Sequence, residues 1–103
     1  MKTSEVIREA RNVLFERGWI QGALERIDGV CLRGAVMTAV RGSYLYLMDT
    51  DVCLVNAAED IIGTQTGGWS IPTWNDMGSR TFDEVIEVLD KAEKIAEQME
   101  AGQ

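Results

Sequence analysis

The chain has 103 residues, 46% of them apolar and 26% charged, and its formal net charge is −7. This length suits one hydrophobic core, and the composition is that of a folded rather than a disordered protein, so we expect a single domain over residues 1–103. No apolar run of about 18 residues occurs and no apolar signal segment follows Met1, so we expect a cytoplasmic protein that crosses no membrane.

The residue types exclude several kinds of chemistry. The sequence contains no histidine, which removes the most common general base and the most common transition-metal ligand. Cys31 and Cys53 alone cannot supply a four-ligand zinc site, and no Cys-x-x-Cys spacing occurs. We therefore expect no metal and no cofactor, and we expect both thiols to be reduced because no secretory context accompanies them.

The first predicted element is an amphipathic helix over residues 4–17, where apolar residues recur at spacings of three, four and seven. Thr3 or Ser4 can cap its start, and Gly18 can end it. Trp19 follows at once, so we expect the chain to leave this helix through a large apolar anchor that folds back onto the core.

A second helix is predicted over about residues 30–41. The Asp28-Gly29 pair before it indicates a turn, with Asp28 as the candidate cap. This segment carries few charges, so we expect it to be the central and most buried helix. Gly34 and Ala35 add little bulk there and would let another element approach closely.

Residues 43–48 alternate enough to hint at a strand, but a lone strand would have no partner, which favours a connecting or helical segment. Capping side chains over residues 49–51 then precede a third helix over about residues 52–62. Gly63 is placed to end that helix.

Residues 63–80 form the one long segment without a helical period, and they contain two of the three tryptophans, Trp69 and Trp74. A loop of this length is uncommon in a small domain, so we expect it to be functional and packed across one end of the molecule. Thr81-Phe82-Asp83-Glu84 is a capping box that starts the last helix. The sequence thus predicts an all-α fold, a single small domain of about four helices with one long aromatic loop before the C-terminal helix.

Cys31 is the first candidate for chemistry. It would lie in the first turn of the second helix, where the helix dipole and free amides lower a thiol pKa, and Arg33 would assist. A nucleophile also needs a base, and only Asp28, Asp76 or a substrate group could serve. The alternative, a small buried hydrophobic residue, is favoured.

The polar cluster beside Trp74 is the second candidate. Asn75, Asp76, Ser79, Arg80 and Thr81 concentrate donors and acceptors before a helix N-terminus, where an anion or a polar small molecule could bind. The favoured alternative is structural, with Trp74 filling the core while Asn75 and Asp76 bond loop amides and helix caps. We also expect the candidate binding residues to converge in space because glycine-marked reversals lie next to them: Trp19, Cys31, Trp74, Asn75, Asp76 and Arg80.

Charge is distributed unevenly along the chain. Residues 1–46 hold seven basic and five acidic side chains (+2), and residues 47–103 hold three and twelve (−9). Only the first part could approach nucleic acid, and we expect no such binding. The six arginines of that part are interpreted as a solvated face with nearby glutamates as partners: Arg8, Arg11, Arg17, Arg26, Arg33 and Arg41, with Glu5, Glu9 and Glu16. The acidic last helix could mimic phosphates toward a basic protein, although a solvated face is favoured there too.

Three stretches carry a resemblance to known proteins: Glu16-Arg17-Gly18-Trp19-Ile20-Gln21-Gly22-Ala23, Val30-Cys31-Leu32-Arg33-Gly34-Ala35-Val36, and Trp74-Asn75-Asp76 with Ser79-Arg80-Thr81. The chain resembles a family of small actinobacterial and actinobacteriophage proteins of unknown function, and the Trp-Asn-Asp loop is the most specific part. Ile20 stands where another cysteine is common in that family, which argues against paired cysteines. The resemblance implies a bacterial or phage setting and no catalytic residue.

These exclusions favour a non-enzymatic protein-interaction module that binds a cellular or host protein, for example as a phage accessory factor in the host cytoplasm. The alternative is a small-molecule binder or minor enzyme that uses Cys31 and the Asn75-Asp76 region. A homodimer also stays open, because Tyr44, Tyr46 and Met48 could form an apolar contact.

Overall fold

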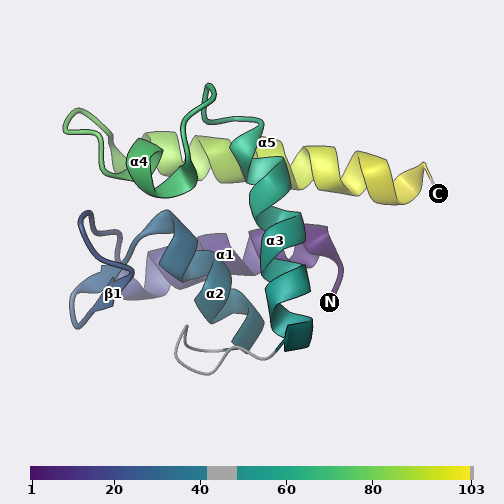
Figure 1. Cartoon of the computed structure of the whole chain (residues 1–103), viewed down its shortest axis with the longest axis horizontal. Coiled ribbons are helices and arrows are strands. Elements are labelled where there is room, and N and C mark those ends of the chain that lie inside the picture. The colour runs from purple at the N-terminus through teal and green to yellow at the C-terminus, as the bar shows by residue number, and fades with distance from the viewer. Residues whose placement is uncertain (42–48, 103) are drawn as a thin grey trace.

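A computed structural model describes residues 1–41 and 49–102 of the chain, and these residues are mostly helical (Figure 1). The helices are α1 (Thr3–Arg17), α2 (Leu32–Arg41), α3 (Asp49–Gly63), α4 (Ile71–Asn75) and α5 (Phe82–Ala101). A short antiparallel hairpin precedes α2 and consists of β1 (Glu25–Arg26) and β2 (Gly29–Val30).

The four longer helices enclose one hydrophobic core. In Figure 1, α1 and α5 run side by side, α2 packs on α1, and α3 crosses both. Each helix contributes buried apolar side chains at helical spacing, among them Val6, Ile7, Ala10 and Leu14 of α1, Ala35 and Val36 of α2, Val55, Ala58 and Ile62 of α3, and Val85, Leu89 and Ala92 of α5. Removing this apolar surface from water is the main force that holds the helices together.

The end of α1 and the start of α5 follow their sequence signals, and the start of α1 does not. α1 stops at Gly18, as predicted. At α5, Thr81 Oγ1 accepts a hydrogen bond from the Glu84 amide (3.2 Å), and the Glu84 carboxylate accepts one from the Thr81 amide (2.9 Å), so the predicted capping box is confirmed. The prediction that Thr3 or Ser4 caps α1 is wrong, because both lie inside the helix and Lys2 is the N-cap. Ser4 instead donates from both its amide and its hydroxyl to Glu100 of α5.

The prediction that Asp28 caps the second helix is wrong. The pairs Glu25–Val30 and Arg26–Gly29 close a hairpin, and Asp28 lies in its two-residue loop. Val30, the first residue of the predicted helix, pairs in β2 instead, and α2 starts two residues later at Leu32. The chain is mostly helical, but the prediction of an all-α fold missed this small two-stranded sheet.

Gly34 shows the close approach that the sequence predicts. A Cβ atom added to Gly34 would lie 2.0 Å from the carbonyl oxygen of Leu24. The backbone that leads into the hairpin therefore packs directly against α2, and only glycine leaves room for it.

The long loop predicted over residues 63–80 contains the short helix α4. Its N-cap is Ser70, whose hydroxyl accepts a hydrogen bond from the Thr73 amide at 3.4 Å, and a proline lies in its first turn. α4 buries Trp74, whereas Trp69 is 57% exposed. The segment therefore packs across one end of the molecule through Trp74 and not through Trp69.

Two expectations fall on residues 42–48. The choice between strand and helix for residues 43–48, and the apolar contact expected of Tyr44, Tyr46 and Met48, lie outside the described residues. Within residues 1–41 and 49–102, no helix combines the length and the apolar character that a membrane span requires.

Candidate functional site

The Asn75 side chain joins three segments of the chain. Its Oδ1 accepts hydrogen bonds from Trp19 Nε1 (2.7 Å) and from the Leu32 amide (3.0 Å). Its Nδ2 donates to the Ile20 carbonyl (3.2 Å) and to Asp76 Oδ1 (2.9 Å). These four bonds use the whole capacity of the amide, and the side chain is fully buried. Residues 19–22, 31–32 and 74–77 are called the Asn75 junction below.

The single turn of α4 places Asn75 in this position, because the helix ends there. A helix end leaves carbonyl groups without partners inside the helix. Gln21 Nε2 serves as such a partner, because it donates hydrogen bonds to the carbonyls of Asn75 (2.9 Å) and Met77 (2.8 Å). Gln21 was not among the predicted site residues, although it lies in one of the stretches that carry the family resemblance.

Asp76 is only partly engaged in the junction. Its Oδ1 accepts from the Gly22 amide (3.0 Å) and from Asn75 Nδ2. The residue is exposed, and its Oδ2 accepts no hydrogen bond from residues 1–41 or 49–102. One oxygen of the carboxylate is therefore bonded within the junction, and the other has no hydrogen bond from the described residues.

Arg80 covers the outer side of Trp74. Its guanidinium carbon lies 3.8 Å from the centroid of the indole ring, and its Nε donates to the Trp74 carbonyl (3.0 Å). The cation is attracted to the face of the ring. A further bond from Nη1 to Glu84 (3.0 Å) ties α4 to the first turn of α5, so the Arg80 charge already has a partner.

Cys31 precedes α2 instead of lying in its first turn. Its carbonyl accepts the first helical bond from the Ala35 amide (2.8 Å), and its Sγ accepts from the Gly34 amide (3.3 Å). The side chain is only 5% exposed. Burial raises the pKa of the Cys31 thiol, and this effect exceeds the lowering by the nearby amides. The thiol is neutral near pH 7, the opposite of what a nucleophile requires.

A hollow of about 270 Å³ opens beside the junction. Its lining combines one acidic, one basic and several apolar groups: Gly22, Ala23, Leu24, Cys31, Arg33, Pro72 and Asp76. Arg33 also forms an ion pair with Glu59 of α3, with 3.2 Å between Nε and Oε2. Burial raises the pKa of Glu59, while the Arg33 charge opposes that effect.

The six predicted binding residues all lie in or around the Asn75 junction. Trp19 and Asn75 are hydrogen-bonded to each other. The Arg80 guanidinium lies over the Trp74 ring, and Cys31 and Asp76 line the hollow. The bonds of Trp19, Trp74, Asn75 and Arg80 are internal, which agrees with the structural interpretation. Ligand binding by the six stays a prediction.

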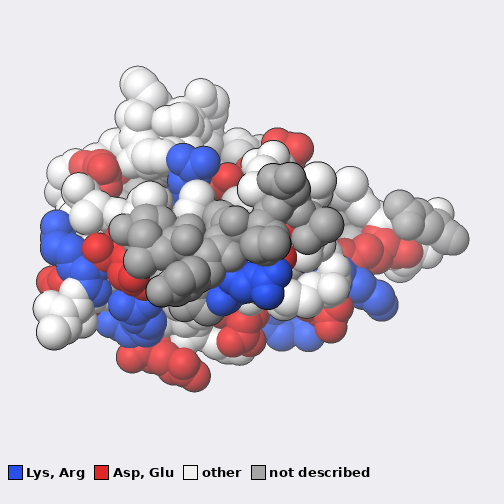
Figure 2. Space-filling view, turned by 60° about the horizontal axis from the view of Figure 1, so that its bottom comes forward, with Lys and Arg blue, Asp and Glu red and all other residues white. Residues whose placement is uncertain are grey.

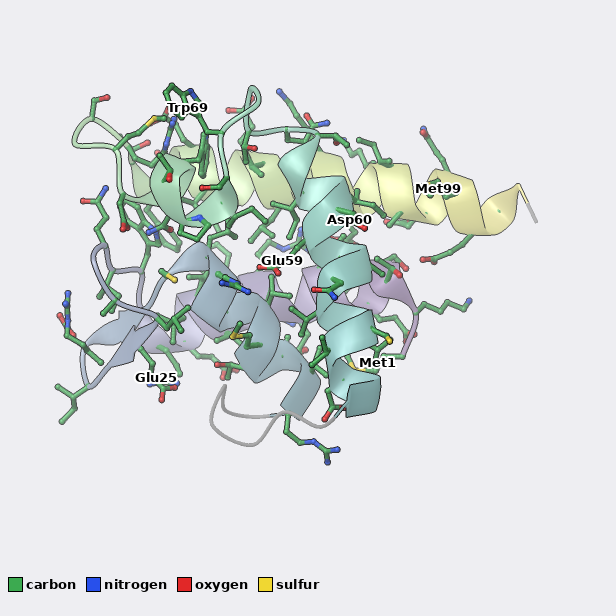
Figure 3. The ribbon with its side chains drawn as sticks, in the orientation of Figure 1. Met1, Glu25, Glu59, Asp60, Trp69 and Met99 are labelled. Atoms are coloured by element: carbon green, nitrogen blue, oxygen red, sulfur yellow. The ribbon has the colours of Figure 1, made fainter. Side chains whose placement is uncertain are left out.

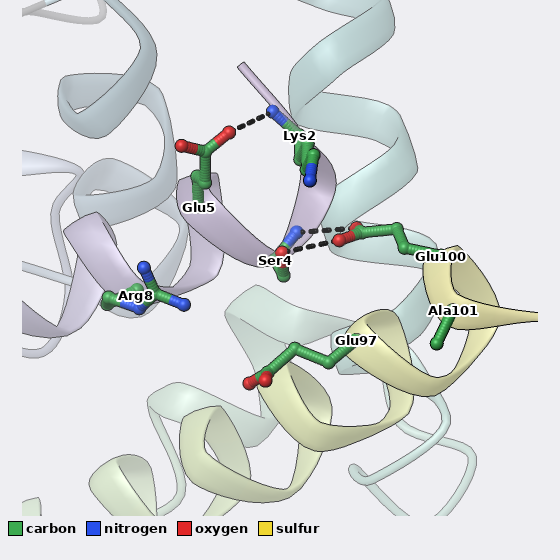
Figure 4. A pocket seen from close by; sticks show the side chains of 7 residues that line it. All are labelled: Lys2, Ser4, Glu5, Arg8, Glu97, Glu100 and Ala101. Carbon is green, nitrogen blue, oxygen red and sulfur yellow. Dashed lines mark hydrogen bonds between the residues drawn. The ribbon is translucent and has the colours of Figure 1, made fainter.

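A second, larger hollow of about 400 Å³ lies where the start of α1 meets the end of α5 (Figure 4). Figure 4 shows the Glu100 carboxylate bonded to the amide and hydroxyl of Ser4, with Arg8 and Glu97 further along the two helices. Charges of both signs line this hollow. The bonds from Ser4 lower the pKa of Glu100.

The arginines of the first part of the chain are paired, as interpreted, but the predicted partners are wrong. Three arginines have partners on distant helices: Arg8 and Arg11 pair with Glu93, Arg11 also with Asp90, and Arg33 with Glu59. The other three have partners within ten residues: Arg17 pairs with Glu25, Arg26 with Asp28 and Arg41 with Asp51. Figure 2 shows the result on one face of the molecule, where blue and red side chains are interspersed. This face presents no broad basic surface for nucleic acid.

The acidic last helix does not present one free row of carboxylates. Asp90, Glu93 and Glu100 turn toward α1 and are bonded to it, and Glu84 is bonded to Arg80. This arrangement disfavours mimicry of a phosphate backbone. Among the described residues, no group of three Cys, Asp or Glu side chains is placed to hold a metal ion.

The junction connects all three of the stretches on which the family resemblance rests. Comparison with curated proteins and with solved structures gives no match. A family model does match, over residues 1–95, and its description is "Family of unknown function (DUF6197)". Because this match covers nearly the whole chain, the chain belongs to the DUF6197 family.

Proposed function

We propose that the protein is a non-enzymatic interaction module that binds a cellular or host protein through Trp69. The observation that carries this proposal is the 57% exposure of the Trp69 side chain on an ordered turn. Figure 3 shows Trp69 at the outer edge of the molecule, beside α4. The setting that we propose is the cytoplasm of a bacterial host, with the protein acting as an accessory factor of phage or chromosomal origin.

Local hydrogen bonds fix the backbone that presents Trp69. The Thr66 side chain is 1% exposed, and its Oγ1 lies 3.0 Å from the Gly63 carbonyl oxygen and 2.7 Å from that of Trp69. The Trp69 amide donates to the Thr66 carbonyl at 3.2 Å. Gly67 and Gly68 have φ angles of 63° and 90°, which other residues rarely adopt. The sequence therefore builds a tight turn with an indole at its end.

A presented indole is suited to protein recognition. Tryptophan is among the residues most enriched where binding energy concentrates, because it buries a large apolar area and its N–H can bond a partner. A side chain on an ordered turn also loses less conformational freedom on binding than one on a flexible segment. Single exposed apolar residues are common, so the support comes from the size of this side chain together with its fixed backbone.

The enzymatic alternative has less support from the geometry. The Asn75 amide is fully bonded, and the Cys31 thiol is buried with a raised pKa. Neither group is available to activate a substrate. The hollow beside Asp76 is the feature of that region that could still bind a small molecule.

The proposal can be tested by placing a photo-crosslinking phenylalanine analogue at the exposed position 64, in the turn that leads to Trp69, and irradiating actinobacterial cells that express the protein. The crosslinked protein is then purified, and its affinity for variants is measured by calorimetry. We expect Trp69→Ala to weaken binding about 30-fold or more, the effect of losing a central tryptophan.

Ile27 offers a matched control, because it is also a large apolar residue and is completely exposed, at the tip of the hairpin. Ile27→Ala should leave the affinity within about twofold of wild type, as surface changes outside an interface do. Equal affinity of the wild-type protein and the Trp69→Ala variant for the captured partner would refute a role for Trp69.

A further inference from the structure

We propose that the hollow beside Asp76 binds a small zwitterion with an apolar body, of which a free apolar amino acid is the simplest form. The Asp76 carboxylate would pair with the ammonium group of the ligand, and the Arg33 guanidinium would pair with its carboxylate. This site is separate from the Trp69 turn, so it does not depend on the proposed interaction with a protein.

The Asp76 carboxylate is preorganised to bind an ammonium group. The Gly22 amide and Asn75 Nδ2 both bond to Oδ1, at 3.0 and 2.9 Å, which fixes the plane of the carboxylate. Oδ2 receives no bond from residues 1–41 or 49–102, and Asp76 is one of the residues that line the hollow. A carboxylate fixed in this way loses little freedom when it accepts a charge-assisted hydrogen bond.

Arg33 provides the opposite charge on the same lining. Its Nε lies 3.2 Å from Glu59 Oε2 in an ion pair. A guanidinium has five N–H donors, so this pair leaves others that can bond a second carboxylate. Its side chain is 42% exposed, so a ligand entering from solvent can reach it.

The remaining walls favour an apolar body of limited size. Ala23, Leu24, Cys31 and Pro72 contribute mainly apolar surface. Sites for drug-sized ligands usually measure about 300–1,000 Å³, so a hollow of about 270 Å³ suits something smaller. A nucleotide or a long peptide would fit in this volume only in part, and a lone inorganic ion would leave the apolar walls unused.

Two zwitterions with different charge spacing, L-leucine and 6-aminohexanoate, serve as probes. We expect at least one of them to raise the melting temperature of the wild-type protein in a concentration-dependent manner. Leucine amide and N-acetyl-leucine each lack one charge and should bind at least about tenfold more weakly, because each loses a charge-assisted bond. Amide resonances of Gly22 and Cys31 should shift on titration in nuclear magnetic resonance spectra.

Asp76→Asn is the sharpest variant. Its side-chain oxygen can still accept from Gly22 and Asn75, but an NH₂ group replaces Oδ2, so the fold is retained while the charge is lost. Binding of the zwitterion should fall at least about tenfold. Ala23→Leu, which fills the hollow, should abolish binding without changing any charge. Trp69→Ala should bind the zwitterion as the wild type does.

Three results would overturn the proposal. The first is the absence of stabilisation and of resonance shifts with either zwitterion at millimolar concentration. The second is equal binding of leucine amide or N-acetyl-leucine, which would show that one charge of the site is not used. The third is unchanged binding in a folded Asp76→Asn variant, which would place the ligand elsewhere.

Discussion

The Asn75 junction and the contact between α1 and α5 join distant parts of the chain by different means. At the junction, one fully buried, uncharged amide makes four hydrogen bonds to three segments. Between α1 and α5, the polar contacts are the Ser4–Glu100 hydrogen bonds and several ion pairs, and the side chains of the ion pairs are partly exposed except for Glu93. At the junction, the contribution to stability is concentrated in one residue. Between α1 and α5, it is divided among several side chains that are partly exposed to water.

This difference follows from the cost of burying polar groups. A buried donor or acceptor that loses its partner has no water to replace it, so removing Asn75 would leave several groups unpaired. A charge at the surface regains water when its partner is removed. The two contacts should therefore respond differently to substitution, to pH and to salt.

The largest effect is expected for Asn75→Ala. The change leaves the Leu32 amide, the Ile20 carbonyl and the Trp19 indole N–H without their protein partner, and it opens a small cavity. We expect a loss of about 3–5 kcal/mol in the free energy of unfolding, measured by urea denaturation.

Asn56 provides the control for this substitution, because it is an exposed asparagine on α3. Asn56→Ala should change the unfolding free energy by less than about 0.5 kcal/mol. A similar small loss for Asn75→Ala would mean that the junction is hydrated and that its bonds do not hold the fold together.

A smaller effect is expected for Glu93→Gln. Glu93 is 8% exposed and lies 2.9 Å from both Arg8 Nε and Arg11 Nη1. The neutral side chain keeps its size but loses two charge-assisted contacts, for which we expect about 1–2 kcal/mol by urea denaturation. Glu87→Gln on the same helix removes only an exposed pair with Lys91 and should cost less than about 0.5 kcal/mol. Equal losses for the two variants would show that burial does not strengthen the ion pairs of Glu93.

The pH dependence of stability should separate the two contacts further. Burial alone would raise the pKa of Glu93, but its bonds and charge pairs with Arg8 and Arg11 lower the pKa below its ordinary value of 4.5. The unfolded state then binds the proton more readily, so this contribution is complete above pH 4.5 and is lost as the pH falls through the lower folded-state pKa. Urea denaturation between pH 3 and pH 7 should show a shallower acid loss in Glu93→Gln than in wild type. Asn75→Ala should keep the wild-type slope.

The smallest effect is expected from salt. At about 1 M ionic strength, charges are screened over about 3 Å, so part of the Glu93→Gln loss should disappear when sodium chloride is added. The loss caused by Asn75→Ala should stay the same, because neutral hydrogen bonds are not screened in this way. A salt effect of equal size on both variants would remove the distinction between the two contacts.

Local signals predicted the long helices well. Apolar spacing located α1, α2, α3 and α5, and Gly18 and the Thr81–Glu84 capping box marked two of their ends. These signals succeed because helix hydrogen bonds and caps join residues that are close in sequence. The hairpin before α2 was missed because each strand has only two residues, too few to show alternation.

Long-range partners were not predictable from the same signals. The Trp-Asn-Asp sequence singled out Asn75, but its partners Trp19 and Leu32 lie 56 and 43 residues away. Glu93 likewise lies 85 residues from Arg8, whereas the sequence suggested neighbouring glutamates. Spacing along a helix indicates which face is buried, but it does not say which distant group faces that side.

The bonds from Ser4 to Glu100 and from Leu32 to Asn75 also bear on the order in which the protein is made. A ribosome adds about 5–20 residues per second from the N-terminal side, so α1 and α2 exist as nascent chain seconds before the groups that bond their first turns. During that interval, water must occupy the amides of both helix starts. The bond from Leu32 can therefore form only after translation has passed residue 75, and the bond from Ser4 only after it has passed residue 100.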